Sequence, residues 1–161
     1  MEMTSGRKGA VAEAAIAAEA TRLGFDVYRP IAEGGRYDLI IDVGKRLLRT
    51  QCKWAMLHGE VVVVRIRTSR LTPRGYVRTT YDATEIDGVA AYCAALRRCY
   101  WLPIDQFAGQ GVVHLRLQPA RNHQRQGLKW AAQYPLGAIA QLGERVTGRH
   151  EVVGSRPTSS T

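Results

Sequence analysis

The stretch that most constrains the fold runs from residue 36 to residue 55 and reads RYDLIIDVGKRLLRTQCKWA. It contains two apolar segments, 37–43 and 47–54, separated by a short turn that includes a glycine. Two such segments around a turn predict a β-hairpin. The first strand would carry Asp38 near its start, so that a carboxylate lies close to one end of the hairpin.

The second strand of this hairpin carries Gln51 and Lys53, with Cys52 between them. Side chains two positions apart on a strand point to the same face, so Gln51 and Lys53 should face Asp38 while Cys52 is buried on the other side. A carboxylate, an amide oxygen and an ammonium at one place can hold a divalent cation and polarise a water. Taken singly, each residue has an ordinary explanation, as a turn aspartate or as a solvated strand residue.

Composition restricts the partners of the chain. Its 161 residues suffice for one domain with a buried core, and 45% of them are hydrophobic. A net charge of +9 predicts a polyanionic partner, which is either nucleic acid or an acidic membrane surface. No segment approaches the roughly 20 apolar residues that span a bilayer, so we expect no membrane insertion. Three cysteines without metal-ligand spacing predict reduced thiols and a cytoplasmic protein.

The remaining sequence predicts a single α/β domain. A helix is expected over 8–23, which ends before a glycine, and a second helix over 88–96 with Asp87 as its N-cap. Residues 68–81 predict a loop or an irregular hairpin, and residues 122–134 predict a partly helical segment. Further strands are expected over the ranges 25–31, 60–67, 100–103 and 112–117. This order of elements predicts a mixed β-sheet flanked by helices.

The C-terminal residues 136–161 differ in character from the rest of the chain. They contain short apolar runs without a clear period and end in a Ser/Thr-rich segment, so we expect a disordered tail after a domain of residues 1–135. The tail also resembles a translated tRNA gene, with 140–143 similar to the D arm and 151–155 to the T arm. We expect no functional role for it in either case.

The first predicted helix offers one more carboxylate. Glu13 precedes Ile16, Ala17 and Ala20 by three, four and seven residues, so it shares the helix face that packs on the sheet. A carboxylate on that face requires a partner. A metal-bound water or Lys53 would serve, although a lone glutamate on a helix is more often an ordinary surface residue.

Together these residues resemble the PD-(D/E)XK nuclease superfamily. The pattern is most similar to the group I intron-associated homing endonucleases, whose motif has glutamine in the acidic position. The resemblance covers roughly residues 8–134 and rests on the following positions: Glu13, Tyr37-Asp38, Gln51, Lys53, Tyr81, Asp87, the YWLP segment at 100–103 and the basic segment 122–130.

The resemblance implies a restriction-endonuclease-like fold and a metal-dependent active site. Asp38, Gln51 and the backbone carbonyl of Cys52 would hold Mg²⁺ or Mn²⁺, and Glu13 would contact the ion through a water. Glu13, Asp38, Gln51 and Lys53 would form the catalytic set, with Lys53 close to the attacking water.

A run of arginines provides a candidate DNA-binding surface. Between residues 61 and 81 there is no acidic residue, and the five arginines are Arg65, Arg67, Arg70, Arg74 and Arg78. Arginine suits both phosphate contacts and guanine recognition. We therefore expect a metal-dependent, sequence-specific endonuclease of the homing type that binds double-stranded DNA as a homodimer or higher homo-oligomer. A junction-resolving or repair nuclease, and an inactive DNA-binding domain on the same fold, are the alternatives.

Overall fold

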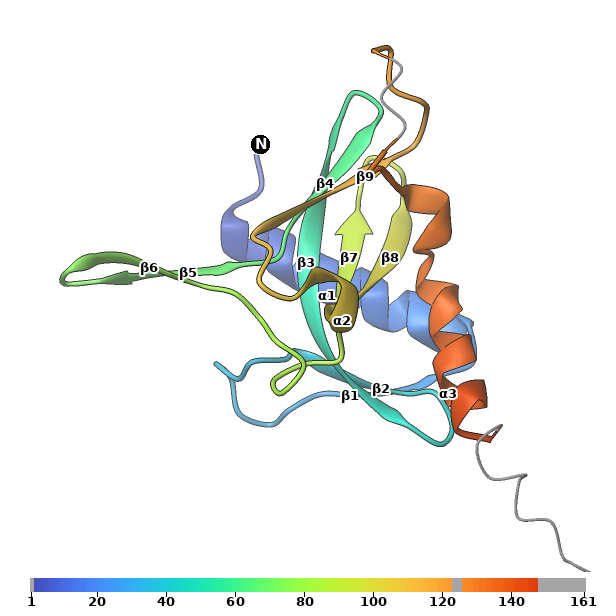
Figure 1. Ribbon diagram of the computed structural model, residues 1–161. Helices are drawn as coiled ribbons and strands as arrows, with labels where there is room; N and C mark the ends of the chain where they lie inside the picture. Colours follow the sequence, from blue (N-terminus) through green and yellow to red (C-terminus); the bar gives the residue numbers. More distant parts are fainter. Residues whose placement is uncertain (1, 123–125, 148–161) are drawn as a thin grey trace, which may run out of the picture.

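The structure is a computed structural model and describes residues 2–122 and 126–147. Eight strands form one mixed sheet, and two more form a separate hairpin that projects from the body (Figure 1). The elements in chain order are α1 (Ser5–Arg22), β1 (Asp26–Tyr28), β2 (Leu39–Asp42), β3 (Leu47–His58), β4 (Val61–Arg65), β5 (Thr68–Thr72), β6 (Gly75–Thr79), β7 (Gly88–Cys93), β8 (Arg98–Pro103), α2 (Ile104–Phe107), β9 (Val112–Arg116), β10 (Lys129–Trp130), the 3₁₀ helices η1 (Ala131–Gln133) and η2 (Leu136–Ile139), and α3 (Ala140–Thr147).

The long strand β3 organises the sheet. Its first part, 47–50, pairs antiparallel with β2, and its last part, 55–58, pairs antiparallel with β4. Its middle, 50–55, pairs in parallel with β7. Residues 51–54 therefore have a strand neighbour on the β7 side only, because β2 and β4 diverge on the other side. The predicted hairpin over 37–54 is confirmed, and this gap between β2 and β4 exposes one edge of its second strand.

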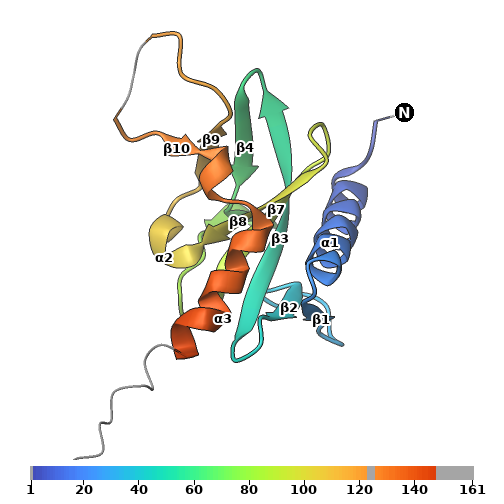
Figure 2. The ribbon, with the colours of Figure 1, turned by 90° about the vertical axis from the view of Figure 1, so that its right-hand side faces the viewer.

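Two apolar clusters cover the two faces of the sheet. Cys52 packs into the cluster that includes Ile16 of α1 and Ile139 of η2. The opposite cluster includes Tyr81, Phe107 of α2 and other buried residues of β4, β7 and β9. Figure 2 shows α1 and α2 on the two sides of the sheet. The alternation along β3 thus buries Cys52 beneath α1 and turns Gln51 and Lys53 to the other face, as the sequence predicts.

The segment 88–96, predicted as a helix, contains the central strand β7 instead. Its residues are buried on both faces of the sheet, so the sequence is a continuous apolar run without the alternation that marks a half-exposed strand. The helical prediction rested on Asp87 as an N-cap. The first position of the strand, Gly88, must be glycine, because a Cβ there would lie 2.3 Å from the Trp101 ring.

The first part of the predicted tail belongs to the folded domain. Leu136 and Ile139 are buried, and Leu142 of α3 packs against the same cluster. Gly143 permits this packing, since a Cβ at that position would lie 2.1 Å from the carbonyl oxygen of Val43. The disorder expected from residue 136 is therefore wrong as far as Thr147, and residues 148–161 lie outside the described part of the chain.

Two other predicted segments are more regular than expected. Residues 68–81 contain the regular hairpin β5–β6, and all five residues of β6 are exposed. Residues 122–134 contain β10 and η1, while positions 123–125 of that prediction lie outside the described residues. In the parts of the chain that the structure describes, no helix is long and apolar enough to cross a membrane.

Candidate active site

Asp38 lies at the start of β2, beside the open edge of β3. Its backbone N–H donates to the carbonyl of Thr50 at 2.9 Å, which continues the β2–β3 ladder by one residue. Its side-chain Oδ2 accepts hydrogen bonds from Gln51 Nε2 at 2.5 Å and from the backbone N–H of Cys52 at 2.8 Å. The Cys52 N–H is available because neither β2 nor β4 pairs with this part of β3. The gap between β2 and β4 therefore leaves a backbone donor free to hold the Asp38 carboxylate.

The environment of Asp38 disfavours the charged form of its carboxylate. Burial raises the pKa of Asp38, and the Cys52 N–H, the Lys53 charge and the Gln51 amide offset this effect only in part. The two hydrogen bonds to the carboxylate both come from neutral donors and both reach Oδ2. Among the described residues, no hydrogen bond reaches Oδ1. A cation placed beside this carboxylate would thus be stabilised by a charge that the protein has not neutralised.

Lys53 extends from the same face of β3 as Gln51 and is partly buried. Burial lowers the pKa of Lys53, while the nearby Asp38 carboxylate opposes that shift. The ammonium lies over the Tyr81 ring, 5.6 Å from the ring centroid. Tyr81 is 3% exposed, and burial raises its pKa to about 12. Lys53 is therefore held between a carboxylate and an aromatic face, with limited access to water.

Glu13 reaches the same site from α1, but with a different partner from the one expected. Glu13 Oε2 forms an ion pair with Arg29 Nη2 at 2.5 Å, rather than a contact with Lys53. Arg29 follows β1 directly. Glu13, Arg29 and Asp38 line one cavity of about 430 Å³, together with the loop between β1 and β2. The two predicted carboxylates are thus brought together, and Arg29 is a site residue that the sequence did not indicate.

The donors at this site fit a hard divalent cation. Mg²⁺ commonly binds one or two carboxylates and completes its shell with water and substrate phosphate, and Asp38 and Glu13 line one cavity. Within the described residues, no three His, Cys, Asp or Glu side chains form a ligand cluster. Gln51 turns its nitrogen, not its oxygen, toward Asp38, because a carboxylate attracts N–H donors. The same nitrogen lies 3.5 Å from the Cys52 carbonyl. The amide would have to turn over to offer an oxygen ligand.

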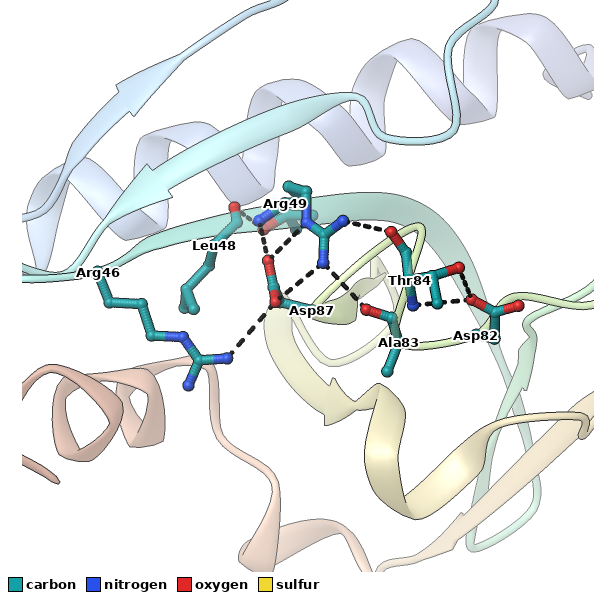
Figure 3. A network of polar contacts seen from close by, with 8 residues as sticks. Arg46, Leu48, Arg49, Asp82, Ala83, Thr84 and Asp87 are labelled. Carbon is teal, nitrogen blue, oxygen red and sulfur yellow. Dashed lines mark hydrogen bonds and ion pairs between the residues drawn. The ribbon is translucent and has the colours of Figure 1, made fainter. Parts of the chain in front are cut away.

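A second aspartate, Asp87, lies on the β7 side of β3. It caps no helix, contrary to the prediction, because β7 follows it. Its Oδ2 accepts hydrogen bonds from the Arg49 backbone N–H at 2.7 Å and Nε at 3.1 Å, and Arg46 lies 3.5 Å from Oδ1 (Figure 3). Arg49 also donates to the carbonyls of Ala83 and Thr84. This network attaches the loop before β7 to strand β3.

Arg36 attaches the same loop at a second point. It forms an ion pair with Glu85 at 2.7 Å, donates to the Thr80 carbonyl, and lies 4.4 Å from the Tyr81 ring centroid. Tyr81 is thereby fixed between the arginine and the neighbourhood of Lys53. No local sequence pattern indicates this contact, because Arg36 and Thr80 lie 44 positions apart.

The predicted DNA-binding arginines lie on and around the projecting hairpin. Arg65 is exposed on β4, Arg67 lies between β4 and β5, Arg70 lies on β5, and Arg74 and Arg78 are exposed in the turn and on β6. Figure 1 shows that the hairpin and the loop between β1 and β2 project on the same side of the molecule. The β5–β6 hairpin, which carries the arginines, thus projects on the same side of the molecule as the loop that lines the Asp38 cavity.

The fold and the site together define a class of enzyme: a mixed sheet, a carboxylate at the gap beside its long strand, and a partly buried lysine two residues beyond a glutamine. The model of the PD-(D/E)XK endonuclease family matches residues 3–137, so the chain belongs to this family. It is therefore an endonuclease, a hydrolase of a family that generally uses divalent metal ions.

A solved structure supports the same conclusion. The fold is similar to that of the bacterial homing endonuclease I-Ssp6803I, with a TM-score of 0.74 and 26% sequence identity. The match covers 93% of this chain and 100% of that protein's chain. No curated protein matches the sequence significantly. The predicted restriction-endonuclease-like fold is confirmed, and the similarity implies DNA as the partner.

Proposed function

We propose that this protein is a metal-dependent, sequence-specific DNA endonuclease of the homing type. The observation that carries the proposal is the state of Asp38, a half-buried carboxylate with a raised pKa that accepts hydrogen bonds only from neutral donors, close to the partly buried Lys53. An arrangement that merely stabilised the fold would be expected to neutralise this carboxylate with a fixed cation. The homing specificity rests on the similarity to the bacterial homing endonuclease.

The metal would be Mg²⁺ or Mn²⁺, held by oxygen ligands. Asp38 is the direct ligand, Gln51 and the carbonyl of Cys52 would add neutral oxygens, and Glu13 would contact the ion through a water. When bound, the ion supplies a water of lowered pKa and neutralises charge on the phosphate.

Lys53 is the protein's own contribution to hydrolysis. Its ammonium would stabilise the negative charge that develops on the scissile phosphate, in a place where burial strengthens electrostatic interactions. The ammonium lies over the Tyr81 ring and is attracted by the Asp38 carboxylate. In this proposal Gln51 orients Asp38 through its amide hydrogen bond in the metal-free protein and turns over to offer its oxygen when the ion binds.

The hairpin β5–β6 would read the DNA. A two-stranded ribbon fits the major groove, and this ribbon carries exposed Arg74 and Arg78 together with the exposed apolar side chains of Leu71, Tyr76 and Val77. Arg65 and Arg67 lie where the hairpin joins the body of the protein, and Arg70 lies on β5. All three would contact the DNA phosphates or the edges of the base pairs. Apolar residues on an isolated hairpin are unfavourable in water, which favours a partner that covers them.

Cleavage of both strands requires two active sites, so we propose a homodimer or higher homo-oligomer with a roughly palindromic target. The three cysteines are free thiols, which fits a reducing compartment such as the cytoplasm.

The proposed function is tested by incubation of the purified protein with a plasmid library, in Mg²⁺ or in EDTA. We expect discrete linear products in Mg²⁺ and none in EDTA, and the product ends would identify the target. Binding of DNA without cleavage in either buffer would contradict the enzymatic proposal. Cleavage of four-way junctions but not of linear duplex would replace homing specificity with junction resolution.

A further inference from the structure

Arg29 lies in the candidate site and has no role in the proposed reaction. It follows β1 and precedes Pro30, at the start of the loop that lines the cavity. Its guanidinium forms the ion pair with Glu13. Its charge also offsets part of the rise that burial causes in the pKa of Asp38. Arg29 is thus the cation nearest to Glu13 among the described ion pairs.

The two carboxylates at this cavity differ before any metal binds. Glu13 is paired with the Arg29 guanidinium, whereas Asp38 accepts hydrogen bonds from neutral donors only. Gln51 contributes no charge, because an amide stands in the position where the wider superfamily has an acid. A divalent cation that approaches this cavity therefore meets one carboxylate without an ion pair, Asp38, and one that is already compensated, Glu13, so Arg29 must withdraw for the full attraction to develop.

Arg29 is the cation that can withdraw. Its side chain is 64% exposed, whereas Lys53 is partly buried and its ammonium lies over the Tyr81 ring. An exposed ion pair is weak and exchanges readily with solvent or with another anion. Arginine binds phosphate through two parallel hydrogen bonds, so a DNA phosphate is a suitable replacement for the Glu13 carboxylate.

We propose that Arg29 is a positioning residue that restrains Glu13 in the free protein and releases it by exchanging the carboxylate for a DNA phosphate. This inference rests on the proposed function. Metal binding and DNA binding would then be coupled: the free protein binds a divalent ion weakly, and binding of DNA makes Glu13 available to it.

The first test measures Mn²⁺ binding to the protein without DNA, by isothermal titration calorimetry. We expect Arg29→Gln to bind Mn²⁺ at least about fivefold more tightly than wild type, since removal of one cation exposes Glu13. Arg29→Lys should be intermediate. The matched control is Arg22→Gln, which removes a similar ion pair, with Glu19 on the same helix, outside the cavity. It should bind Mn²⁺ as wild type does.

The second test measures binding to a random-sequence 30-bp duplex in EDTA over a range of KCl concentrations. Loss of one phosphate contact should lower the slope of log affinity against log salt by about one in Arg29→Gln and leave it unchanged in Arg22→Gln.

Mn²⁺ binding by Arg29→Gln that is equal to or weaker than that of wild type would overturn the inference. So would tighter binding that persists in the double variant Arg29→Gln/Glu13→Gln, since the gain would then not depend on Glu13. Tighter Mn²⁺ binding with an unchanged salt slope would overturn the exchange with phosphate. If neither protein binds Mn²⁺, Arg29 does not limit metal binding and the inference fails. The proposed function is judged separately, by cleavage in Mg²⁺ against EDTA.

Discussion

Two aspartates flank strand β3 on opposite edges and have opposite electrostatic states. The N–H of Asp38 donates to the carbonyl of Thr50, and the N–H of Asp87 donates to the carbonyl of the adjacent Arg49. The carboxylate of Asp38 accepts only neutral donors, whereas that of Asp87 accepts the Arg49 guanidinium and lies near Arg46. Burial acts to raise both pKa values. The pKa of Asp38 lies above its usual value as a result, whereas the Arg49 hydrogen bonds hold the pKa of Asp87 below its usual value.

The comparison separates a structural aspartate from a candidate catalytic one. Asp87 has its counter-charge built into the fold, and its network fixes the loop that carries Tyr81. Asp38 lacks a bound counter-charge, and its nearest ammonium, on Lys53, is held at the Tyr81 ring instead of on the carboxylate. One carboxylate therefore stabilises the sheet, and the other retains charge for a ligand.

The largest expected effect is the loss of cleavage in Asp38→Asn. Removal of the charge removes the direct metal ligand, which is worth several kcal/mol of transition-state stabilisation, so the rate should fall about 100-fold or more. The measurement is the rate of plasmid linearisation in Mg²⁺. Because burial disfavours the Asp38 charge, the thermal midpoint should not fall. A variant that cleaves at the wild-type rate would contradict the assignment of the site.

The corresponding change on the other edge, Asp87→Asn, should lower stability. It leaves the partly buried Arg49 guanidinium without its carboxylate, which costs about 2 kcal/mol. Urea denaturation followed by circular dichroism measures this loss. Arg46→Ala is the control, since its contact with Asp87 is longer and more exposed, and it should change stability by less than about 0.5 kcal/mol. Equal losses for the two variants would contradict the network described.

Gln51→Glu should sharpen the distinction between the two aspartates. The Gln51 amide donates to Asp38 at 2.5 Å, so a glutamate there would place two carboxylates in contact. We expect the metal-free protein to lose about 1 kcal/mol of stability, as one unit of pKa perturbation implies. Mn²⁺ should in turn raise its thermal midpoint more than that of wild type. A metal-free protein of unchanged stability would show that Gln51 and Asp38 are not in contact.

The smallest expected effect is an opposite pH dependence of the two asparagine variants. The lowered pKa of folded Asp87 stabilises wild type above the unfolded value of about 3.9, and this stability disappears as the pH falls through the folded pKa. The raised pKa of folded Asp38 means that its ionisation destabilises the fold at neutral pH. The advantage of Asp38→Asn should therefore shrink as the pH falls below the folded pKa. Urea midpoints from pH 3 to pH 7 measure both trends, and parallel trends would refute the comparison.

The sequence predicted the parts of the fold that have a local signature. The hairpin over 37–54 consists of two apolar segments around a glycine turn, and this pattern predicted that Gln51 faces Asp38, as the hydrogen bond between them shows. The helix that carries Glu13 was predicted from its composition and its apolar period.

The parts that were missed depend on contacts distant in sequence. A strand buried on both faces, such as β7, lacks the alternation that distinguishes it from a helix. The packing of α3 depends on the close approach of Gly143 to Val43, which no local pattern reveals. Arg29, the partner of Glu13, lies 16 positions away in the sequence, and only the packing of β1 against α1 brings the two side chains together.

Lys53→Ala tests whether Asp38 and Lys53 form the site of hydrolysis. The measurement compares plasmid cleavage in Mg²⁺ with DNA binding by the same protein, against Lys45→Ala, which removes an exposed lysine from the turn before the same strand. We expect Lys53→Ala to bind DNA without cleaving it, while Lys45→Ala does both. Cleavage by Lys53→Ala at the wild-type rate would show that hydrolysis takes place elsewhere.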